Sequence, residues 1–213
     1  MANKYKVILL DMDGTIAYTD EMIVQTFYRL YDMYNPDMKK DRSEIFYFSG
    51  PPLSITLPRE FPNQDYKFMY DEFIRISTPY YDKYVVPFDN ELEVLEKLKE
   101  AGYKLVIVTN KATKMAYYVL DIIKARNLFE FVIGSNDVSH PKPHQEGIEL
   151  ALAKLGVDKK EAIYIGDNDI DYQTAYNAGI DSMICNWGPR ILNVLDNANY
   201  VVNSYLEIKD ILL

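Results

Sequence analysis

The sequence predicts an α/β fold, in which a doubly wound parallel sheet carries a small inserted helical domain. Three observations lead to this prediction. Short apolar runs rich in β-branched residues recur at 7–10, 105–108, 131–133 and 162–165. Amphipathic, helix-like sequence follows each run, and a long segment after the first run has helical patterns but no comparable strand. Strands that alternate with helices indicate a parallel sheet covered on both faces.

Two of the helical patterns end at glycines, which accept the left-handed conformation that commonly closes a helix. They are Leu92, Leu95 and Leu98 before Gly102, and Ile148, Leu152 and Leu155 before Gly156. These helices would cover the sheet that the apolar runs form.

The inserted segment, from about residue 20 to residue 84, reads as helices. Apolar residues recur there at helical spacing. The two stripes are Ile23, Phe27, Leu30 and Tyr34, and Tyr66, Met69, Phe73, Ile76 and Tyr80. Thr19 or Asp20 can cap the first helix, whereas residues 49–62, with four prolines, are expected to be irregular. The predicted division is a core domain of residues 1–16 and 86–213 and a helical cap domain of residues 17–85.

Composition argues against several kinds of partner. The 213 residues include 32 acidic and 23 basic side chains, and the formal charge of −9 repels nucleic acid and anionic membrane surfaces at long range. No window approaches the roughly 20 apolar residues of a membrane span, and the first ten residues lack the pattern of a signal peptide. Cys185 is the only cysteine, so a reducing cytoplasm is the expected compartment.

Residues with charged or hydrogen-bonding side chains directly follow three of the four apolar runs. Residues 11–15 (Asp-Met-Asp-Gly-Thr) follow the first, 109–111 (Thr-Asn-Lys) the second, and 166–171 (Gly-Asp-Asn-Asp-Ile-Asp) the fourth. Lys142 lies between two prolines in the loop before the fourth run. Ligands bind beyond the carboxyl ends of the strands in such sheets, so these residues are expected to meet at one edge.

The residue types at this edge suit phosphoryl chemistry. Asp11 and Asp13 lie two positions apart, which would let Asp11 attack phosphorus while Asp13 carries a proton, first as general acid and then as general base. Two carboxylates beside an anionic substrate need a hard cation, and Mg²⁺ suits carboxylate and phosphate oxygens. Thr109, Asn110 and Lys142 offer donors and positive charge to the phosphoryl oxygens, and Lys142 would favour the ionised form of Asp11.

The four segments, in this order and spacing, resemble the four motifs of the haloacid dehalogenase (HAD) superfamily over residues 7 to about 185. The resemblance implies a Rossmann-like core and a Mg²⁺-dependent phosphatase that forms an aspartyl-phosphate on Asp11. It also implies the metal ligands, which are one oxygen of Asp11, the main-chain carbonyl of Asp13 and the carboxylate of Asp167, with water completing the shell. Asp171 lies four positions beyond Asp167 and fits a water-mediated contact if a helix begins there.

The cap loop Phe-Ser-Gly-Pro-Pro-Leu at 48–53 is similar to the Gly-Pro loop of phosphoglycolate phosphatase-like enzymes and of the related bacterial inorganic pyrophosphatases. Gly50 is therefore expected to contact the substrate, and the loop to set selectivity. The expected substrate is a small phosphorylated metabolite, either a phosphoglycolate-type phosphomonoester or inorganic pyrophosphate. Candidate anion contacts in the cap are Arg42, Arg59 and Lys67, and Lys111 could touch either the ligand or the cap.

Two other interpretations stay open. A phosphoglucomutase-like enzyme would transfer phosphate rather than release it, although that branch often has a different acidic pair where this chain has Gly166-Asp167. A non-catalytic binding or regulatory protein on the same fold is the second, and the presence of every motif residue argues against it.

Three further features bear on the substrate and the assembly. Tyr18 departs from the acidic or amide residue usual in phosphoglycolate phosphatases. His140 and His144 flank Lys142 and are interpreted as loop and helix-start residues. Both a monomer and a homodimer are compatible with the sequence.

Overall fold

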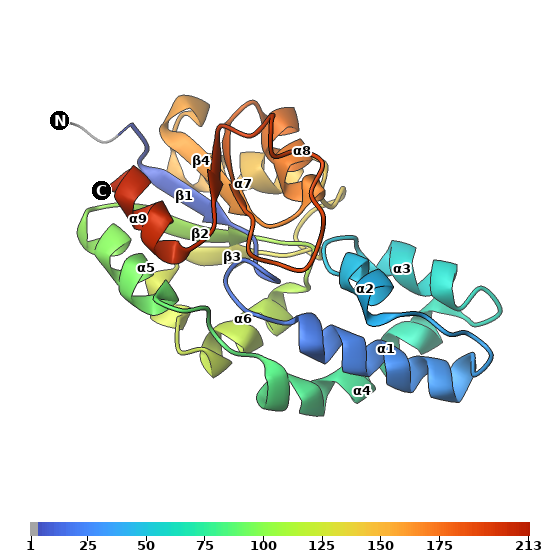
Figure 1. Cartoon of the computed structure of the whole chain (residues 1–213). Coiled ribbons are helices and arrows are strands. Elements are labelled where there is room, and N and C mark those ends of the chain that lie inside the picture. The colour runs from blue at the N-terminus through green and yellow to red at the C-terminus, as the bar shows by residue number, and fades with distance from the viewer. Residues whose placement is uncertain (1–3) are drawn as a thin grey trace.

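The computed structural model describes residues 4–213 and has the predicted α/β architecture (Figure 1). Within these residues, six parallel strands form one sheet in the order β3-β2-β1-β4-β5-β6. The strands are β1 (Val7–Leu10), β2 (Lys104–Val108), β3 (Phe131–Ile133), β4 (Ala162–Gly166), β5 (Asp181–Cys185) and β6 (Tyr200–Val202). The doubly wound parallel sheet is confirmed, and β5 and β6 extend it beyond the four apolar runs.

Side chains that alternate along the strands build one core on each face of the sheet. In β1, Ile8 and Leu10 pack into the first core, and Val7 and Leu9 pack into the second. The first face is covered by α5 (Glu91–Glu100), α6 (Thr113–Ile122) and α9 (Tyr205–Leu212), and the second by α7 (Glu146–Leu155) and α8 (Asp169–Ala178). Full burial of such an aliphatic side chain contributes roughly 1.5–3 kcal/mol, so the two cores hold the strand ends in a fixed arrangement.

The cap lies beyond one end of the strands (Figure 1). It consists of α1 (Asp20–Tyr34), α2 (Arg42–Ile45), a 3₁₀ turn (Phe46–Phe48), α3 (Leu53–Glu60) and α4 (Tyr66–Tyr84). The expectation of irregular structure over 49–62 was wrong, because α3 begins directly after Pro52 and buries Thr56 and Leu57. Pro58 lies inside this short helix and removes one backbone hydrogen bond, which burial of the apolar face outweighs. Helix α4 also continues through Pro79 to Tyr84, since Ile76 and Tyr81 are buried on either side of it.

The two connections between sheet and cap run side by side. The Tyr18 amide donates to the Val86 carbonyl at 2.9 Å, in an isolated antiparallel bridge. Just beyond it, the buried Glu91 carboxylate accepts a hydrogen bond from the Phe88 amide at 2.8 Å. Both connections therefore leave the core at one place, where the cap is joined to it.

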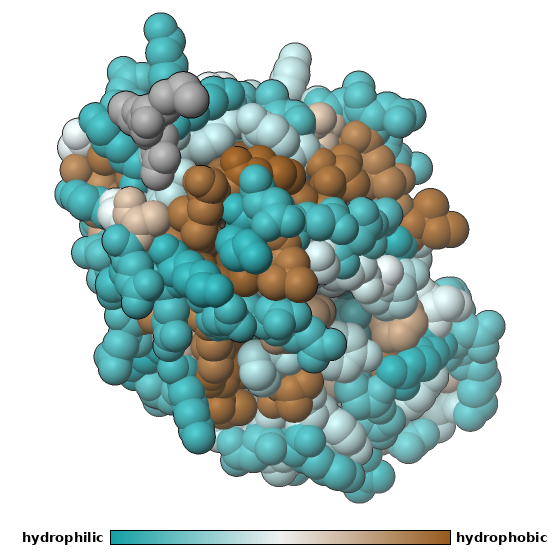
Figure 2. Space-filling view, turned by 60° about the vertical axis from the view of Figure 1, so that its left-hand side comes forward, coloured by the Kyte–Doolittle hydropathy of each residue, from teal (hydrophilic) through white to brown (hydrophobic). Residues whose placement is uncertain are grey.

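Hydrophilic side chains cover much of the face shown in Figure 2, and hydrophobic ones gather near its middle. Large apolar side chains that are exposed at the C-terminal end of the chain include Val201, Leu206, Ile211 and Leu213. None of the helices over residues 4–213 is both long enough and apolar enough to cross a membrane.

Candidate active site

Three strand ends bring the site residues together. Asp11 directly follows β1, Thr109 follows β2 and Asp167 follows β4. Because β1 pairs with β2 on one side and with β4 on the other, the three side chains meet at the carboxyl edge of the sheet. All three are buried. The fold therefore brings the three side chains together at the sheet edge where the sequence predicts that they meet.

A buried carboxylate cluster lies at this edge. Asp11, Asp167 and Asp171 each offer an oxygen, and these oxygens lie within 4.8 Å of one another. Asp13 Oδ1, two residues beyond Asp11, is buried without a hydrogen-bond partner among the described residues. Oxygen donors of this kind, with coordination capacity to spare, fit a hard divalent cation such as Mg²⁺.

Lys142 supplies the fixed positive charge beside this cluster. Its Nζ lies 2.7 Å from Asp11 Oδ1, 2.7 Å from Asp171 Oδ1 and 2.8 Å from the Tyr164 hydroxyl. The Asn110 side chain holds the Lys142 backbone on both sides, since Oδ1 accepts from the Lys142 amide at 2.9 Å and Nδ2 donates to its carbonyl at 3.2 Å. The loop that carries Lys142 is thus tied to the end of β2.

Asp171 organises the turn between β4 and α8. Its Oδ2 accepts from the backbone amides of Asp167 and Asn168, each at 3.0 Å, while Asn168 caps the start of the helix. The helix that the sequence expectation for Asp171 required does begin here. Asp171 therefore holds the Asp167 backbone with one oxygen and reaches Lys142 with the other. Its contact with a metal stays a prediction.

Burial dominates the electrostatics of the cluster. It raises the pKa of Asp11 to about 6, and the opposing effect of the Lys142 ammonium only partly offsets this. It likewise raises the pKa of Asp167 to about 6 against the opposing charge of Arg190. Burial alone would lower the pKa of Lys142, but the charges of Asp11 and Asp171 hold it well above its ordinary value. Lys142 thus favours the ionised form of Asp11 as expected, yet desolvation has the larger effect.

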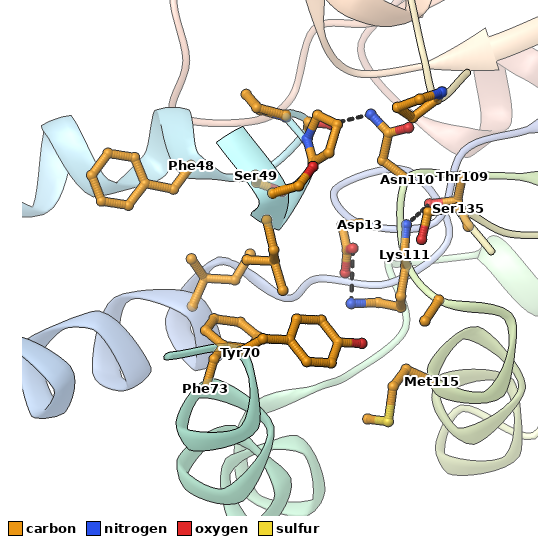
Figure 3. Close-up of a pocket in the computed structure, with 18 of the residues that line it drawn as sticks. Asp13, Phe48, Ser49, Tyr70, Phe73, Thr109, Asn110, Lys111, Met115 and Ser135 are labelled. Atoms are coloured by element: carbon orange, nitrogen blue, oxygen red, sulfur yellow. Dashed lines mark hydrogen bonds and ion pairs between the residues drawn. The ribbon is translucent and has the colours of Figure 1, made fainter. Parts of the chain in front are cut away.

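Asp13 lies apart from the three clustered carboxylates and pairs with Lys111. The Lys111 Nζ is 2.9 Å from Asp13 Oδ2 (Figure 3). It is also 3.0 Å from the hydroxyl of Tyr81, which belongs to cap helix α4. Lys111 therefore touches both a predicted catalytic residue and the cap. The Thr109 hydroxyl accepts from the Lys111 amide at 3.2 Å, which fixes the start of the loop after β2.

Arg190 is a functional candidate that the sequence reasoning missed. It lies in the segment after β5, and its buried guanidinium donates to Asp20 Oδ1 at 2.9 Å, to the Phe46 carbonyl at 3.1 Å and to Asp167 Oδ2. Asp20 and Phe46 belong to the cap, so one arginine joins the cap to a core carboxylate. Asp20 does not cap α1 through its side chain, and Thr19, at the N-cap position, makes no capping hydrogen bond. The sequence gives one sign of such a residue. Acidic side chains are in excess at this edge, so a second buried cation is needed to balance them.

A pocket of about 390 Å³ opens between this edge and the cap, with Asp11, Asp13, Thr109 and Asn110 among the residues that line it. The cap loop closes against the core through two backbone carbonyls. Asn110 Nδ2 donates to the Gly50 carbonyl at 2.8 Å, and Asn168 Nδ2 donates to the Ser49 carbonyl at 3.1 Å. Gly50 has a φ of 108°, and a Cβ there would lie 2.7 Å from Asn168 Nδ2. This close approach requires glycine.

The predicted cap cations lie elsewhere. Arg42 pairs with Glu21, Arg59 with Glu60, and Lys67 with Asp71, and none of the three cations lines the pocket. His140 and His144 lie in the exposed loop before α7, as interpreted. Glu146 is within metal-binding reach of both rings, but it already accepts hydrogen bonds from the Ser139 and His140 amides.

Comparison with known proteins gives one family. Residues 8–185 match the sequence profile of the haloacid dehalogenase-like hydrolases. The chain is 30% identical to the pyrophosphatase PpaX of Halalkalibacterium halodurans over 206 residues, which cover 96% of this chain and 95% of that protein. It is 35% identical to the PpaX of Bacillus velezensis over 184 residues, covering 84% and 82% of the two chains.

Solved structures agree with the profile. A protein of Bacteroides fragilis described as a haloacid dehalogenase-like hydrolase superposes with a TM-score of 0.88 at 24% identity, covering 96% of this chain and all of the other. A predicted phosphatase from Clostridium acetobutylicum has a TM-score of 0.77 at 28% identity, with 97% of each chain covered. A predicted phosphoglycolate phosphatase from Haemophilus somnus 129PT has a TM-score of 0.85 at 21% identity, covering 99% of each chain. At these identities the first and third likenesses concern the fold alone.

Proposed function

The chain belongs to the haloacid dehalogenase-like hydrolase family, and on that premise we propose that it hydrolyses a small phosphorylated metabolite, with Mg²⁺, through an aspartyl-phosphate on Asp11. One observation carries the proposal. Asp11 sits in a buried carboxylate cluster with an ammonium group 2.7 Å from its Oδ1, and it borders a pocket large enough for a small ligand. An anionic nucleophile, a fixed cation beside it and a pocket for the substrate are what phosphoryl transfer needs.

In the first step, an Asp11 oxygen attacks phosphorus and the bond from phosphorus to the leaving oxygen breaks. Asp13 donates a proton to that oxygen. In the second step, Asp13 takes a proton from a water molecule, which attacks the phosphoryl group and releases Asp11 and inorganic phosphate. The Asp13 carboxylate borders the same pocket and is held by Lys111, which supports its role as proton carrier.

The phosphoryl oxygens need donors that are in place before the reaction. Thr109 and Asn110 line the pocket beside Asp11, and the Lys142 Nζ lies 2.7 Å from Asp11 Oδ1. We assign Thr109 and Lys142 to the catalytic set on this ground. Asn110 and Gly50 border the pocket at the junction of core and cap, which supports a substrate-binding role for both.

Asp11, Asp13 and Asp167 would hold the metal, with Asp171 as an outer contact. When bound, a divalent cation would neutralise charge on the phosphoryl group and on the nucleophile. The oxygens of Asp11, Asp167 and Asp171, which lie within 4.8 Å of one another, support this assignment.

Phosphoglycolate-type esters and inorganic pyrophosphate are two candidate substrates of this kind, since PpaX relatives carry the pyrophosphatase name and the cap loop resembles that of phosphoglycolate phosphatases. The net charge of −9 and the lone cysteine support a cytoplasmic location and a small-molecule partner rather than nucleic acid.

The test is phosphate release from a panel of phosphate esters and pyrophosphate, ranked by kcat/KM with Mg²⁺. Turnover that depends on Asp11 supports the proposal. Isomerisation of a hexose phosphate without net phosphate release would instead indicate a mutase. Absence of turnover on every compound, including a generic aryl phosphate, would indicate a non-catalytic protein.

A further inference from the structure

We infer that the pocket selects phosphomonoesters whose leaving group is uncharged and largely apolar, with aromatic groups preferred, over pyrophosphate and phosphoglycolate. This inference rests on the proposed phosphohydrolase function of the same site and ranks its substrates, placing the two candidates named above below esters with an uncharged, apolar leaving group. Three features of the pocket support it. They are the apolar side chains on the side away from Asp11, the charges of the lining residues, and the volume.

The cap side of the pocket is an aromatic and aliphatic wall. Phe27 of α1, Phe48 of the 3₁₀ turn and Phe73 of α4 pack against one another, with ring centroids 4.7 Å apart for Phe27 and Phe48 and 5.8 Å apart for Phe27 and Phe73. In Figure 3, Phe48, Tyr70 and Phe73 lie at the end of the pocket away from Thr109, and Met115 borders it from α6. A leaving group that points away from Asp11 would meet these side chains.

The pocket has little positive charge for a second anionic group. Of the side chains that line it, only those of Asp11, Asp13 and Lys111 are charged. Lys111 is already paired with Asp13 at 2.9 Å and bonded to Tyr81 at 3.0 Å. The cap cations Arg42, Arg59 and Lys67 are paired with carboxylates outside the pocket. A carboxylate or second phosphate placed against the aromatic wall would lose hydration without gaining a charged partner, which disfavours its binding.

The size of the pocket fits a leaving group bulkier than that of phosphoglycolate or pyrophosphate. Its volume of about 390 Å³ lies within the range of about 300–1,000 Å³ that is usual for organic ligands. The reaction itself is unchanged, since the ester bond breaks and the phenol or alcohol leaves with the proton from Asp13.

The experiment compares two esters that differ by one charge, phenyl phosphate and 4-carboxyphenyl phosphate, with phosphoglycolate and inorganic pyrophosphate as further substrates. The two phenols have similar acidity, so a difference in kcat/KM reports the pocket. For the wild-type enzyme with Mg²⁺, we expect kcat/KM to be at least about tenfold higher for phenyl phosphate, because leaving a charge unpaired in the pocket costs more than the 1.4 kcal/mol that tenfold represents.

A pair of variants places a charge in the wall. Tyr70 is only partly buried, so Tyr70→Lys is expected to fold, and Tyr70→Met is its uncharged control of similar length. Tyr70→Lys should reduce the discrimination against the carboxylated ester about tenfold, whereas Tyr70→Met should retain it. Thermal melting of both variants checks that they are folded.

The outcomes separate the two proposals. If wild type prefers 4-carboxyphenyl phosphate, phosphoglycolate or pyrophosphate, the inference about the leaving group is overturned and the proposed phosphohydrolase function stands. If the two phenyl esters are hydrolysed equally well, the wall does not select by charge and the inference is also overturned. If no compound is hydrolysed, the proposed function fails, and the inference fails with it.

Discussion

Arg190 of the core donates a hydrogen bond to Asp20, the first residue of cap helix α1, at 2.9 Å. The same guanidinium bonds Asp167, which the proposed mechanism uses as a metal ligand. Both carboxylates and the arginine side chain are 2% exposed, so one positive charge pairs with two negative charges away from water. This bridge couples the position of the cap to the carboxylate cluster.

Replacing Arg190 by Met should destabilise the protein by about 3–5 kcal/mol, because it leaves two buried carboxylates without their partner. Urea unfolding measures the loss. Mg²⁺ should recover more stability in Arg190→Met than in wild type, since a cation bound at Asp167 takes over part of the missing charge. Arg190→Lys keeps the charge but cannot span both carboxylates, and its stability should be intermediate. A loss under about 1 kcal/mol in Arg190→Met would show that the bridge is not structural.

Asp11→Asn should abolish turnover, because the amide is not a nucleophile. Asp13→Asn should lower kcat by roughly 10²–10⁴-fold through loss of the proton carrier, while still allowing slow phosphorylation of Asp11. Mass spectrometry of the quenched enzyme detects the labelled aspartate, and phosphate release gives the rates. Wild-type activity in Asp11→Asn would contradict the covalent mechanism.

Chelation should stop turnover without unfolding the chain, because Lys142 and Arg190 pair with the site carboxylates and the fold does not depend on a metal cage. Circular dichroism before and after treatment with EDTA checks the fold, and added Mg²⁺ should restore activity. Full activity in the chelated enzyme, or rescue by zinc alone, would mean that the metal site is assigned wrongly.

Glu91, where the cap connection meets α5, should make stability depend on pH. Burial raises the pKa of Glu91 from 4.5 to about 8 in the folded protein, and the hydrogen bond from the Phe88 amide only partly opposes this. The native state therefore binds more protons than the unfolded state between these two values, so stability should fall as pH rises through this window. At pH 7 the free energy of unfolding should be lower, by on the order of 3 kcal/mol, than it would be if Glu91 stayed protonated in both states.

The matched variant is Glu91→Gln, which keeps an acceptor for the Phe88 amide and removes the ionisation. The free energy of unfolding should favour Glu91→Gln over wild type by an amount that grows from pH 4.5 to about pH 8 and then levels off. Parallel pH profiles for the two proteins would show that Glu91 does not titrate in this range.

Much of the fold could be predicted from the sequence because its signals are local. The four apolar runs form β1 to β4, and Gly156 closes α7 in the left-handed conformation that the pattern predicts. Strand β5 was missed because it opens with Asp181 and Ser182, and β6 because it has only three residues. Helix α3 was missed because prolines are read as breaks, although Pro52 precedes this helix and Pro58 lies near its end.

The sequence by itself determined the α/β class and the identities of Asp11, Asp13, Thr109, Lys142 and Asp167 as candidates, because strand ends and motif spacing are properties of the local chain. Only the tertiary structure decided how their charges are balanced. Arg190 reaches Asp20 across 170 positions, and Lys142 reaches Asp171 across 29. Pairings over such separations depend on how the elements pack, and no local pattern encodes them. The lining of the pocket is decided in the same way, because the cap cations that the sequence offered to the substrate fold onto carboxylates elsewhere.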